Sequence, residues 1–392
     1  MKDLKHLIYF ENLLQEANNE LVQQAVKEGD KALGYNCYYI PEPLLNLPGC
    51  FSSRLRAPNC SSTDVASYYM TTRNCPYVRA ILERAVEGGY NYLNALFGAE
   101  CCAAMERMEE HFSLIDPVKN KDFFTTIIDP PLKYDDNAID YYKAGLKLKV
   151  VDELHKRGVD TSEEAMKAAI EDHNEISRII TEIGDFRKLE NPPITGYEFH
   201  VINLVSLTCP HRLIKPYLEE TLEEIKKRKP EKKFPFRARV VMVGSEIDDP
   251  EFIKLVESCG AMVVADRFCF GSIPGREQIE IREGENAFDA ICRHYLETNL
   301  CARFMSGDKI DQRHSTMERL YRDYKADGII IENMKFCEFW SYEKVLGSYL
   351  MINERNIPCC TIEKEYVVGS AGQLRTRFQA FVESLEIKKI NS

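Results

Sequence analysis

Three cysteines occupy positions where a parallel α/β sheet gathers its functional groups, at strand ends and helix starts. Cys102 follows the run YNYLNALFGAEC, Cys337 follows DGIIIENMKF, and Cys75 precedes the helical stretch PYVRAILERA. The N-terminus of a helix stabilises negative charge, so we expect a lowered pKa for each of these thiols. Thiolates bind soft metal ions and iron. These positions predict a metal or iron centre.

The remaining cysteines carry a weaker signal. The chain has fourteen cysteines and no CxxC pair, which argues against the common zinc ribbons. For most of the others we prefer the interpretation of a small buried hydrophobic residue. This group comprises Cys37, Cys259, Cys269, Cys292, Cys301, Cys359 and Cys360.

Composition narrows the class of protein. The net charge of -11 argues against a nucleic-acid backbone as the main partner. The N-terminal stretch has no apolar region typical of a secretion signal, and no run is long enough to span a membrane. We therefore expect a cytoplasmic protein, and 392 residues are enough for two domains.

Strand and helix signals alternate in both halves, which predicts an α/β fold with parallel sheets. In the first half, strands are expected in KALGYNCYYIP, YNYLNALFGAECC and FFTTIIDPP. In the second half they are expected in FHVINLVSL, RARVVMVGS, AMVVADRFCFG, DGIIIENMKF and IPCCTIE. Residues 3–30 read as one amphipathic helix, and residues 137–190 have long helical periodicity.

These signals predict two doubly wound α/β domains with helical additions. We expect an N-terminal helical segment at residues 1–34 and a first α/β domain at 35–136. A helical connector follows at 137–195, and a second α/β domain occupies 196–392.

Five segments carry a family resemblance. They are YIPEPLLNLPG, SSRLRAPNCSSTDVASYYMTTRNCPYVRA, ECCAAMERM, DGIIIENMKFCEF and GSAGQLRTRFQAFVES. In this order, over nearly the whole chain, they resemble the 2-hydroxyacyl-CoA dehydratase and benzoyl-CoA reductase family. The resemblance implies two flavodoxin-like parallel-sheet domains with an N-terminal helix and a helical connector.

The resemblance also implies one 4Fe-4S cluster per chain, held by cysteines from both domains. Carried over by motif, the ligands are Cys75, Cys102 and Cys337. The doublet leaves Cys101 open as the second ligand, although the spacing to Arg107 favours Cys102. Cys60 lies fifteen residues before Cys75, a spacing that also occurs in related proteins with a larger double-cubane cluster. If Cys60, Cys101 and another thiol were ligands, that larger cluster is the alternative.

The implied activity removes water from a 2-hydroxyacyl-CoA to give a 2-enoyl-CoA through a ketyl radical anion. One alternative is a benzoyl-CoA reductase type subunit that reduces an aromatic acyl-CoA. Another is a non-catalytic subunit that relays electrons. The family pairs two homologous subunits and takes electrons from an ATP-dependent iron-sulfur activator protein. The lack of a GxxxxGK[ST] phosphate loop here agrees with that division of labour.

Several polar residues are candidates for contact with an acyl-CoA substrate. Glu42 could act as an acid or base, or be a turn residue. The serines could hydrogen-bond the thioester or the substrate hydroxyl, or be structural. The arginines could bind CoA phosphates, and the last two could equally form a solvated face or a contact between subunits. These candidates are Ser52, Ser53, Arg54, Arg56, Arg375 and Arg377.

Two histidines flank Cys209, which suggests a metal site. His200 and His211 have a spacing that fits no standard site, so we interpret them as core or loop histidines.

Overall fold

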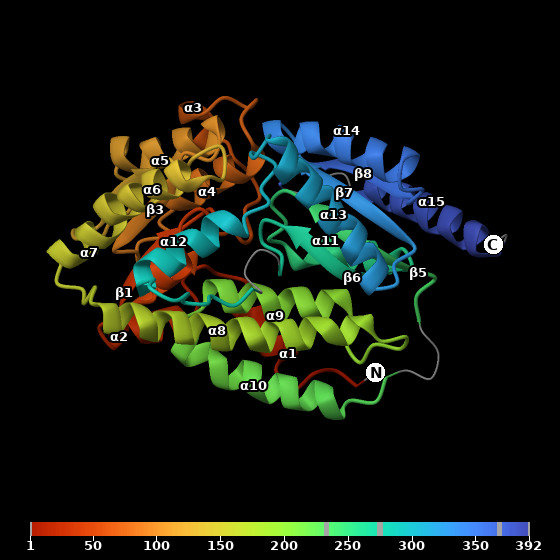
Figure 1. Cartoon of the computed structure of the whole chain (residues 1–392), viewed down its shortest axis with the longest axis horizontal. Coiled ribbons are helices and arrows are strands. Elements are labelled where there is room, and N and C mark those ends of the chain that lie inside the picture. Colours follow the sequence, from red (N-terminus) through yellow and green to blue (C-terminus); the bar gives the residue numbers. More distant parts are fainter. Residues whose placement is uncertain (1, 231–234, 273–276, 367–370, 391–392) are drawn as a thin grey trace.

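The computed structural model describes residues 2–230, 235–272, 277–366 and 371–390. Two four-stranded parallel sheets lie above a layer of helices (Figure 1). The first sheet contains β1 (Lys31–Tyr35), β2 (Cys50–Arg54), β3 (Ala95–Ala99) and β4 (Phe124–Ile128). The second contains β5 (Ala238–Gly244), β6 (Ala261–Phe268), β7 (Gly328–Met334) and β8 (Cys359–Lys364).

Both sheets have the same strand order. The first runs β2-β1-β3-β4 and the second β6-β5-β7-β8, with every neighbouring pair parallel. This is the order of a flavodoxin-like sheet, in which ligands bind at the carboxyl ends of the strands near the point where the order reverses. The predicted fold class is confirmed.

The helices of the first domain surround its sheet. They are α1 (Leu7–Leu13), α2 (Glu20–Lys27), the short η1 (Glu42–Leu45), α3 (Ala66–Tyr69), α4 (Pro76–Val86) and α5 (Ala103–Leu114). The single helix expected over residues 3–30 is wrong, because the chain breaks between α1 and α2. The side chain of Asn19 accepts hydrogen bonds from the backbone N–H groups of Leu21 and Val22 and so starts a new helix.

The connector is helical, as expected. It comprises α6 (Asp136–Leu146), the π-helical turn η2 (Lys147–Val151), α7 (Asp152–Lys156), α8 (Glu163–Asp185) and the turn η3 (Phe186–Lys188). Then come α9 (Gly196–Thr208) and α10 (His211–Lys227). In Figure 1, α8, α9 and α10 form the layer below both sheets. Helix α9 contacts β2 of the first sheet and β6 of the second, so it connects the two domains.

Helix α9 corrects one prediction, since its residues were expected to form the strand FHVINLVSL. Thr195 and Glu198 form a capping box at its start. The helix is buried on nearly all sides, so its apolar residues show no one-sided periodicity. A continuous apolar run of this kind does not distinguish a buried strand from a buried helix.

In the second domain, helices cover both faces of the sheet. Helices α11 (Pro250–Ser258) and α15 (Ala371–Ile390) pack on one face, and α13 (Gly307–Asp323) and α14 (Glu338–Asn353) on the other. Helix α12 (Ala287–Glu297) belongs to this half by sequence but packs against α6 and α8. The domain boundaries stay predictions. Helix α12 lies in the predicted second domain but packs on helices of the predicted connector.

Across the described residues, none of the helices combines the length and apolar content needed to cross a membrane.

Candidate active site

The three thiols predicted to form a centre all begin helices. Cys75 is the N-cap of α4, Cys102 of α5 and Cys337 of α14, so two come from the first domain and one from the second. Before Cys337 the backbone turns through Phe336 with a φ of 63°, a left-handed conformation that is rare for an aromatic residue. This turn directs the chain from β7 into α14.

The charges of these three thiols act on one another, Cys102 on Cys75 and both of them on Cys337. Burial and, after it, the charge of Cys102 together raise the pKa of Cys75 to about 12. Burial also raises the pKa of Cys337 well above its usual value, with added contributions from Cys75 and Cys102. The expected lowering of the pKa is therefore wrong for Cys75 and Cys337, because loss of solvent outweighs the helix N-terminus.

Cys102 behaves as expected. A hydrogen bond from Cys101 lowers the pKa of the Cys102 thiol, and the backbone amides of Met105 and Ala104 act in the same direction. Cys101 itself lies between Cys102 and Cys37, and its pKa is raised well above the usual value. Cys102, and not Cys101, is the thiol whose charge acts on both Cys75 and Cys337.

Three cysteine thiols are the kind of donor that iron-sulfur clusters use, and the cluster itself stays a prediction. Among the described residues, no three Cys, His, Asp or Glu side chains are arranged to hold one metal ion. In a 4Fe-4S cluster each thiolate binds a different iron, so the sulfurs surround the cluster instead of converging on one point. Backbone amides of Tyr77 and Val78 favour negative charge on Cys75, as that of Trp340 does on Cys337.

Cys60 lies elsewhere. Its thiol donates a hydrogen bond to the carbonyl of Ser62 at 3.0 Å, and burial raises its pKa to about 11. It lines a separate cavity together with Arg56 and Asp248. None of the three clustered thiols contributes to that cavity lining.

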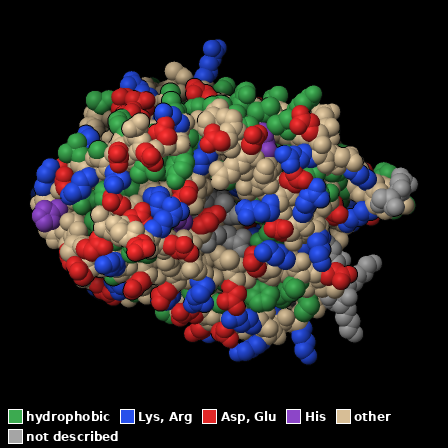
Figure 2. All heavy atoms as spheres, viewed as in Figure 1, with side chains coloured by type: hydrophobic (Ala, Val, Ile, Leu, Met, Phe, Trp, Pro, Cys, Tyr) green, Lys and Arg blue, Asp and Glu red, His purple; other side chains and the backbone are tan. Residues whose placement is uncertain are grey.

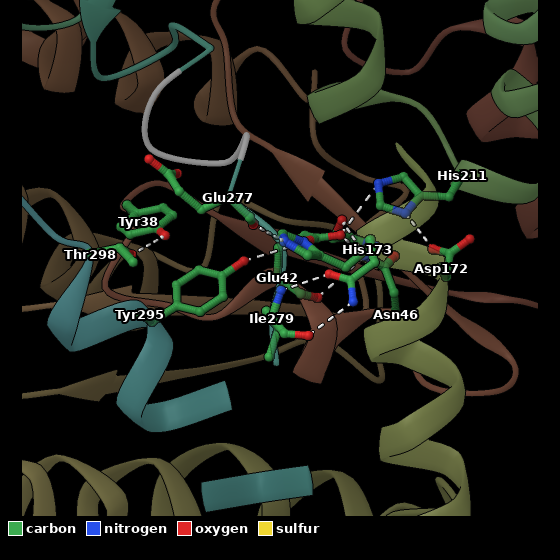
Figure 3. Close-up of polar contacts among 12 residues, drawn as sticks. Tyr38, Glu42, Asn46, Asp172, His173, His211, Glu277, Ile279, Tyr295 and Thr298 are labelled. Carbon is green, nitrogen blue, oxygen red and sulfur yellow. Dashed lines mark hydrogen bonds and ion pairs between the residues drawn. The ribbon is translucent and has the colours of Figure 1, made fainter. Parts of the chain in front are cut away.

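Glu42 is the centre of a buried polar network (Figure 3). It lies at the start of η1, directly after the segment that leaves β1. Its Oε2 is 2.8 Å from Nδ1 of His173 on α8, and its Oε1 is 3.4 Å from Nε2 of His211 at the start of α10. Asn46 donates a hydrogen bond to its Oε1 at 2.6 Å, and Tyr295 donates one to its Oε2 at 3.3 Å.

The network extends from the interior toward solvent. Nδ1 of His211 is 2.5 Å from Oδ2 of Asp172, whose side chain is 32% exposed, whereas that of Glu42 is 11% exposed. Burial raises the pKa of Glu42, but His173 and His211 outweigh it and leave that pKa below its usual value. Burial lowers the pKa of His211, but Glu42 and Asp172 reverse this and raise it to about 9.

This arrangement can hold and move a proton. An ionised carboxylate faces two imidazoles, one of them linked to a partly exposed aspartate. Glu42, His173, His211 and Tyr295 line a small cavity. Tyr38 and Arg54 line both this cavity and a neighbouring small one that is also lined by Trp340 of α14.

Sequence reasoning missed most of this network. Glu42 was a candidate, but His211 was interpreted as a core or loop residue, and Asp172, His173 and Tyr295 were not singled out. Asp172 and His173 lie in α8, whose charged 3.6-residue periodicity indicates a helix but does not mark any of its residues as functional. His200 agrees with its interpretation, since burial lowers its pKa to about 3 and its ring contacts Phe268.

The two candidate serines lie inside β2. Ser52 Oγ accepts a hydrogen bond from Asn46 at 3.1 Å, and Ser53 Oγ is 2.9 Å from the hydroxyl of Tyr92. Through Asn46, Ser52 connects to Glu42. Neither serine lines the two cavities beside Arg54.

The candidate arginines fall into three environments. Arg54 is buried over the ring of Phe270, at 4.2 Å from its centre. Arg56 is also buried and donates hydrogen bonds to the backbone carbonyls of Asp248 and Leu14.

The last two arginines are exposed on α15. Arg375 donates to the Ser258 hydroxyl at 3.0 Å, and Arg377 to the carbonyl of Thr361 at 2.7 Å. A role for any of the four arginines in CoA binding stays a prediction.

The chain is a two-domain α/β protein with flavodoxin-like sheets, and three of its cysteines cap the starts of helices. The family model described as 2-hydroxyglutaryl-CoA dehydratase, D-component, matches residues 37–385, and this chain belongs to that family. The recognition made from the five segments is confirmed.

Several curated proteins are similar along almost their whole length. The (R)-phenyllactyl-CoA dehydratase beta subunit of Clostridium sporogenes is 22% identical over 96% of this chain and 97% of its own. The (R)-2-hydroxyglutaryl-CoA dehydratase, subunit beta, of Acidaminococcus fermentans is 22% identical over 91% and 93%. A benzoyl-CoA reductase subunit of Thauera aromatica is 19% identical over 92% and 93%.

Proposed function

We propose that this chain is the iron-sulfur subunit of a 2-hydroxyacyl-CoA dehydratase, which converts a 2-hydroxyacyl-CoA to a 2-enoyl-CoA and water. The observation that carries the proposal is that Cys75, Cys102 and Cys337, from two domains, each cap the start of a helix, and that Cys75 and Cys102 act on the pKa of Cys337. Family membership and the dehydratase subunits among its relatives support the same reaction. These thiols would hold one 4Fe-4S cluster.

The reaction needs a donor of one electron and a base that accepts a proton. Cys75, Cys102 and Cys337 would hold the cluster, which would supply the reversible one-electron reduction of the thioester that this elimination needs. The hydroxyl leaves from the α carbon and a proton leaves from the β carbon. Glu42 is suited to the proton transfer, because its carboxylate is ionised and hydrogen-bonded beside a cavity.

His211 and Asp172 keep that proton mobile. The charge on His211 maintains Glu42 as a base, and the partly exposed Asp172 gives the network an exit to solvent. His173 fixes one oxygen of Glu42 and also contacts the carbonyl of Glu277 at 3.3 Å, which orients its ring.

A homologous second subunit is proposed as the partner. Helix α14 turns an apolar stripe of Tyr342, Val345, Tyr349 and Ile352 to solvent, with each residue between 47% and 66% exposed. Figure 2 shows hydrophobic side chains along the upper edge of the molecule, where α14 runs in Figure 1. Exposed apolar patches of this kind are typical of interfaces between subunits.

The position of the stripe supports this partner. Cys337 starts the same helix, so a second protein docked on α14 would lie beside the proposed cluster. Relatives of this chain are named as subunits of dehydratases and of a reductase. An ATP-dependent iron-sulfur activator protein is proposed as the electron donor.

The test begins with anaerobic reconstitution of the chain, followed by iron and sulfide analysis. The reconstituted chain is then mixed with its partner subunit, the activator, ATP and a panel of acyl-CoAs. We expect release of water from a 2-hydroxyacyl-CoA without net consumption of electrons. Absence of iron after reconstitution would overturn the proposal.

The same assay separates the alternatives. Stoichiometric transfer of electrons into an aromatic ring would assign the chain to the benzoyl-CoA reductase type, represented among its relatives by the protein from Thauera aromatica. Binding of acyl-CoA to the partner subunit alone would assign it a relay role.

A further inference from the structure

Arg54 lies between two small cavities. It is the last residue of β2, and it lines both the cavity around Glu42 and the neighbouring cavity that Trp340 lines. We call these spaces the Glu42 cavity and the Trp340 cavity. Trp340 lies in the first turn of α14, the helix that Cys337 caps. The guanidinium of Arg54 is therefore placed between the proposed base and the helix that carries a proposed cluster ligand.

Three contacts fix the guanidinium of Arg54. Its Nε donates a hydrogen bond to the backbone carbonyl of Asn36 at 3.3 Å. Its Cζ lies 4.2 Å from the ring centre of Phe270 and 5.8 Å from that of Tyr35. Aromatic faces attract a cation and favour stacking of a planar guanidinium. The side chain is thus oriented before any ligand binds.

The two terminal nitrogens of Arg54 are available to a ligand. The residue is only 4% exposed, yet within the described part of the chain Nη1 and Nη2 form no hydrogen bond or ion pair. Buried donors in folded proteins are nearly always satisfied, and a guanidinium has five of them. Unused donors beside two cavities point to a ligand that accepts hydrogen bonds there.

The positive charge of Arg54 is largely uncompensated. Glu246 is the acidic side chain whose charge acts most on Arg54, and it also lines the Trp340 cavity. Burial raises the pKa of Glu246 to about 8, so most of this carboxyl is protonated at neutral pH. A buried cation without an ionised partner is costly and favours a ligand that carries or develops negative charge.

Size narrows the ligand further. Both cavities are small, so the nucleotide part of CoA with its phosphates has no room beside Arg54. A thioester group is much smaller, and its oxygen gains negative charge when the thioester takes up one electron. A donor placed where charge develops stabilises the reduced thioester more than the neutral one.

We propose that Arg54 donates hydrogen bonds from its terminal nitrogens to the thioester oxygen of the bound 2-hydroxyacyl-CoA. The inference rests on the proposed function and adds a catalytic residue to it. It also replaces the expectation that Arg54 binds CoA phosphates.

The proposed role fits a balanced elimination. One electron, delivered from the proposed activator protein, adds to the thioester carbonyl, and Arg54 stabilises the charge on its oxygen. The bond between the α carbon and the hydroxyl then breaks, and the hydroxide takes a proton from solvent to become water. Glu42 accepts the proton from the β carbon and returns one to solvent, and the electron goes back to its donor as the 2-enoyl thioester forms.

Isotope-edited infrared spectroscopy tests the contact without turnover. The probe is the 2-hydroxyacyl-CoA that the panel assay converts fastest, isotopically labelled at the thioester carbonyl carbon. It is bound to the reconstituted chain and its partner subunit in the absence of activator and ATP. A hydrogen bond from a guanidinium weakens the C=O bond, so the carbonyl band should lie below that of the free thioester. In Arg54→Gln the band should return toward the free value.

Kinetics distinguish this role from CoA binding. Arg54→Gln should lower kcat by about 10²- to 10³-fold, the usual effect of removing a donor to a developing oxyanion, with little change in KM. Arg54→Lys keeps the charge without the planar fork and should recover part of kcat. A raised KM with an unchanged kcat would indicate a phosphate contact and overturn the inference.

Arg239→Lys is the matched control. Arg239 is a buried arginine of β5 that donates hydrogen bonds to the backbone carbonyls of Tyr324 and Arg187, and it lines neither cavity. This variant should lose stability but keep the wild-type carbonyl band and the wild-type kcat per folded molecule.

The outcomes separate this inference from the proposed function. A wild-type band at the free value, or an Arg54→Gln variant as active as the control, would overturn the role of Arg54 and leave the proposed function standing. A wild type that converts no 2-hydroxyacyl-CoA would overturn both. If Arg54→Gln fails to fold by circular dichroism, the wild-type band and the kcat of Arg54→Lys decide.

Discussion

Oε2 of Glu42 lies 2.8 Å from Nδ1 of His173, although 131 positions separate the two residues in the chain. Glu42 follows the first strand of the first sheet, and His173 lies in the middle of α8. The helical layer below the sheets therefore contributes one partner of a hydrogen-bonded pair that faces a cavity.

Replacement of Glu42 by Gln removes the base and keeps the side-chain shape. We expect the turnover rate to fall by about 10²- to 10⁴-fold, the usual contribution of general acid-base catalysis. The iron content should stay at the wild-type value, because Glu42 is not one of the proposed cluster ligands. Anaerobic turnover and iron analysis of the same preparation measure both.

A matched control is Glu257→Gln, which changes a half-buried glutamate whose pKa is raised to about 7 by burial. Glu257 accepts hydrogen bonds from the backbone N–H groups of Gly196 and Tyr197 at the start of α9, away from the cavity of Glu42. This variant should lose stability but keep its activity per folded molecule. If Glu42→Gln is as active per folded molecule as Glu257→Gln, Glu42 is not the base of the reaction.

Stability should decrease as pH rises through the range in which His211 loses its proton. Its folded pKa of about 9 lies above the ordinary value of 6.5. The stabilisation is therefore complete below about pH 6.5 and disappears as pH passes 9. The shift corresponds to roughly 3 kcal/mol in the free energy of unfolding.

Urea unfolding at pH 6, 7.5 and 9.5 measures this slope. His211→Gln should have a nearly flat profile over the same interval. On the acid side, the lowered pKa values of Glu42 and Asp172 mean that stability is lost only as pH falls below their usual range. An unchanged slope in the variant would show that another group is responsible.

The buried pair of Arg313 and Glu343 should be essential for folding of the second domain. Their side chains are 0% exposed, and Nη2 of Arg313 lies 2.8 Å from Oε2 of Glu343. Glu343→Gln leaves the guanidinium without a compensating charge, so we expect a loss of about 3 to 5 kcal/mol in the free energy of unfolding.

Urea titration monitored by the single tryptophan, Trp340, measures this loss, since that residue lies on the same helix. Lys147→Gln is the surface control, because its partner Asp152 and the lysine itself are both partly exposed. It should change stability by less than about 1 kcal/mol. A similar loss in both variants would contradict the role assigned to burial.

The apolar stripe of α14 predicts a defined effect on association with the homologous partner. Tyr349→Asp introduces a charge at its centre and should weaken binding of that partner at least about tenfold, a cost of roughly 1.4 kcal/mol. Leu148→Asp, on the exposed turn η2, is the control. Analytical ultracentrifugation of the mixed subunits measures the affinity, and equal binding by both variants would exclude α14 as the interface.

Much of the fold could be predicted because local signals agreed with it. Strands β5, β6 and β7 each contain a run of apolar residues and are buried along their whole length, as expected for parallel strands covered on both faces. Strand β2 escaped prediction because Ser52, Ser53 and Arg54 give it a polar composition, and their burial depends on tertiary partners.

The site was predictable only in part, for a similar reason. Position relative to strands and helices singled out Cys75, Cys102 and Cys337 before any contact was known. The pKa values of these thiols depend on burial, which a motif does not encode. No local signal places Arg54 at a cavity, and only the folded chain sets it between two of them.

Because Cys75 and Cys102 come from one domain and Cys337 from the other, a cluster ligated by all three would act as a cross-link within the chain. Such a link restricts the unfolded ensemble as a long-range disulfide does, and metal loss would release that constraint. Oxygen damage to the cluster would then have a mechanical consequence as well as a chemical one. The boundary between the domains would loosen and become open to proteases.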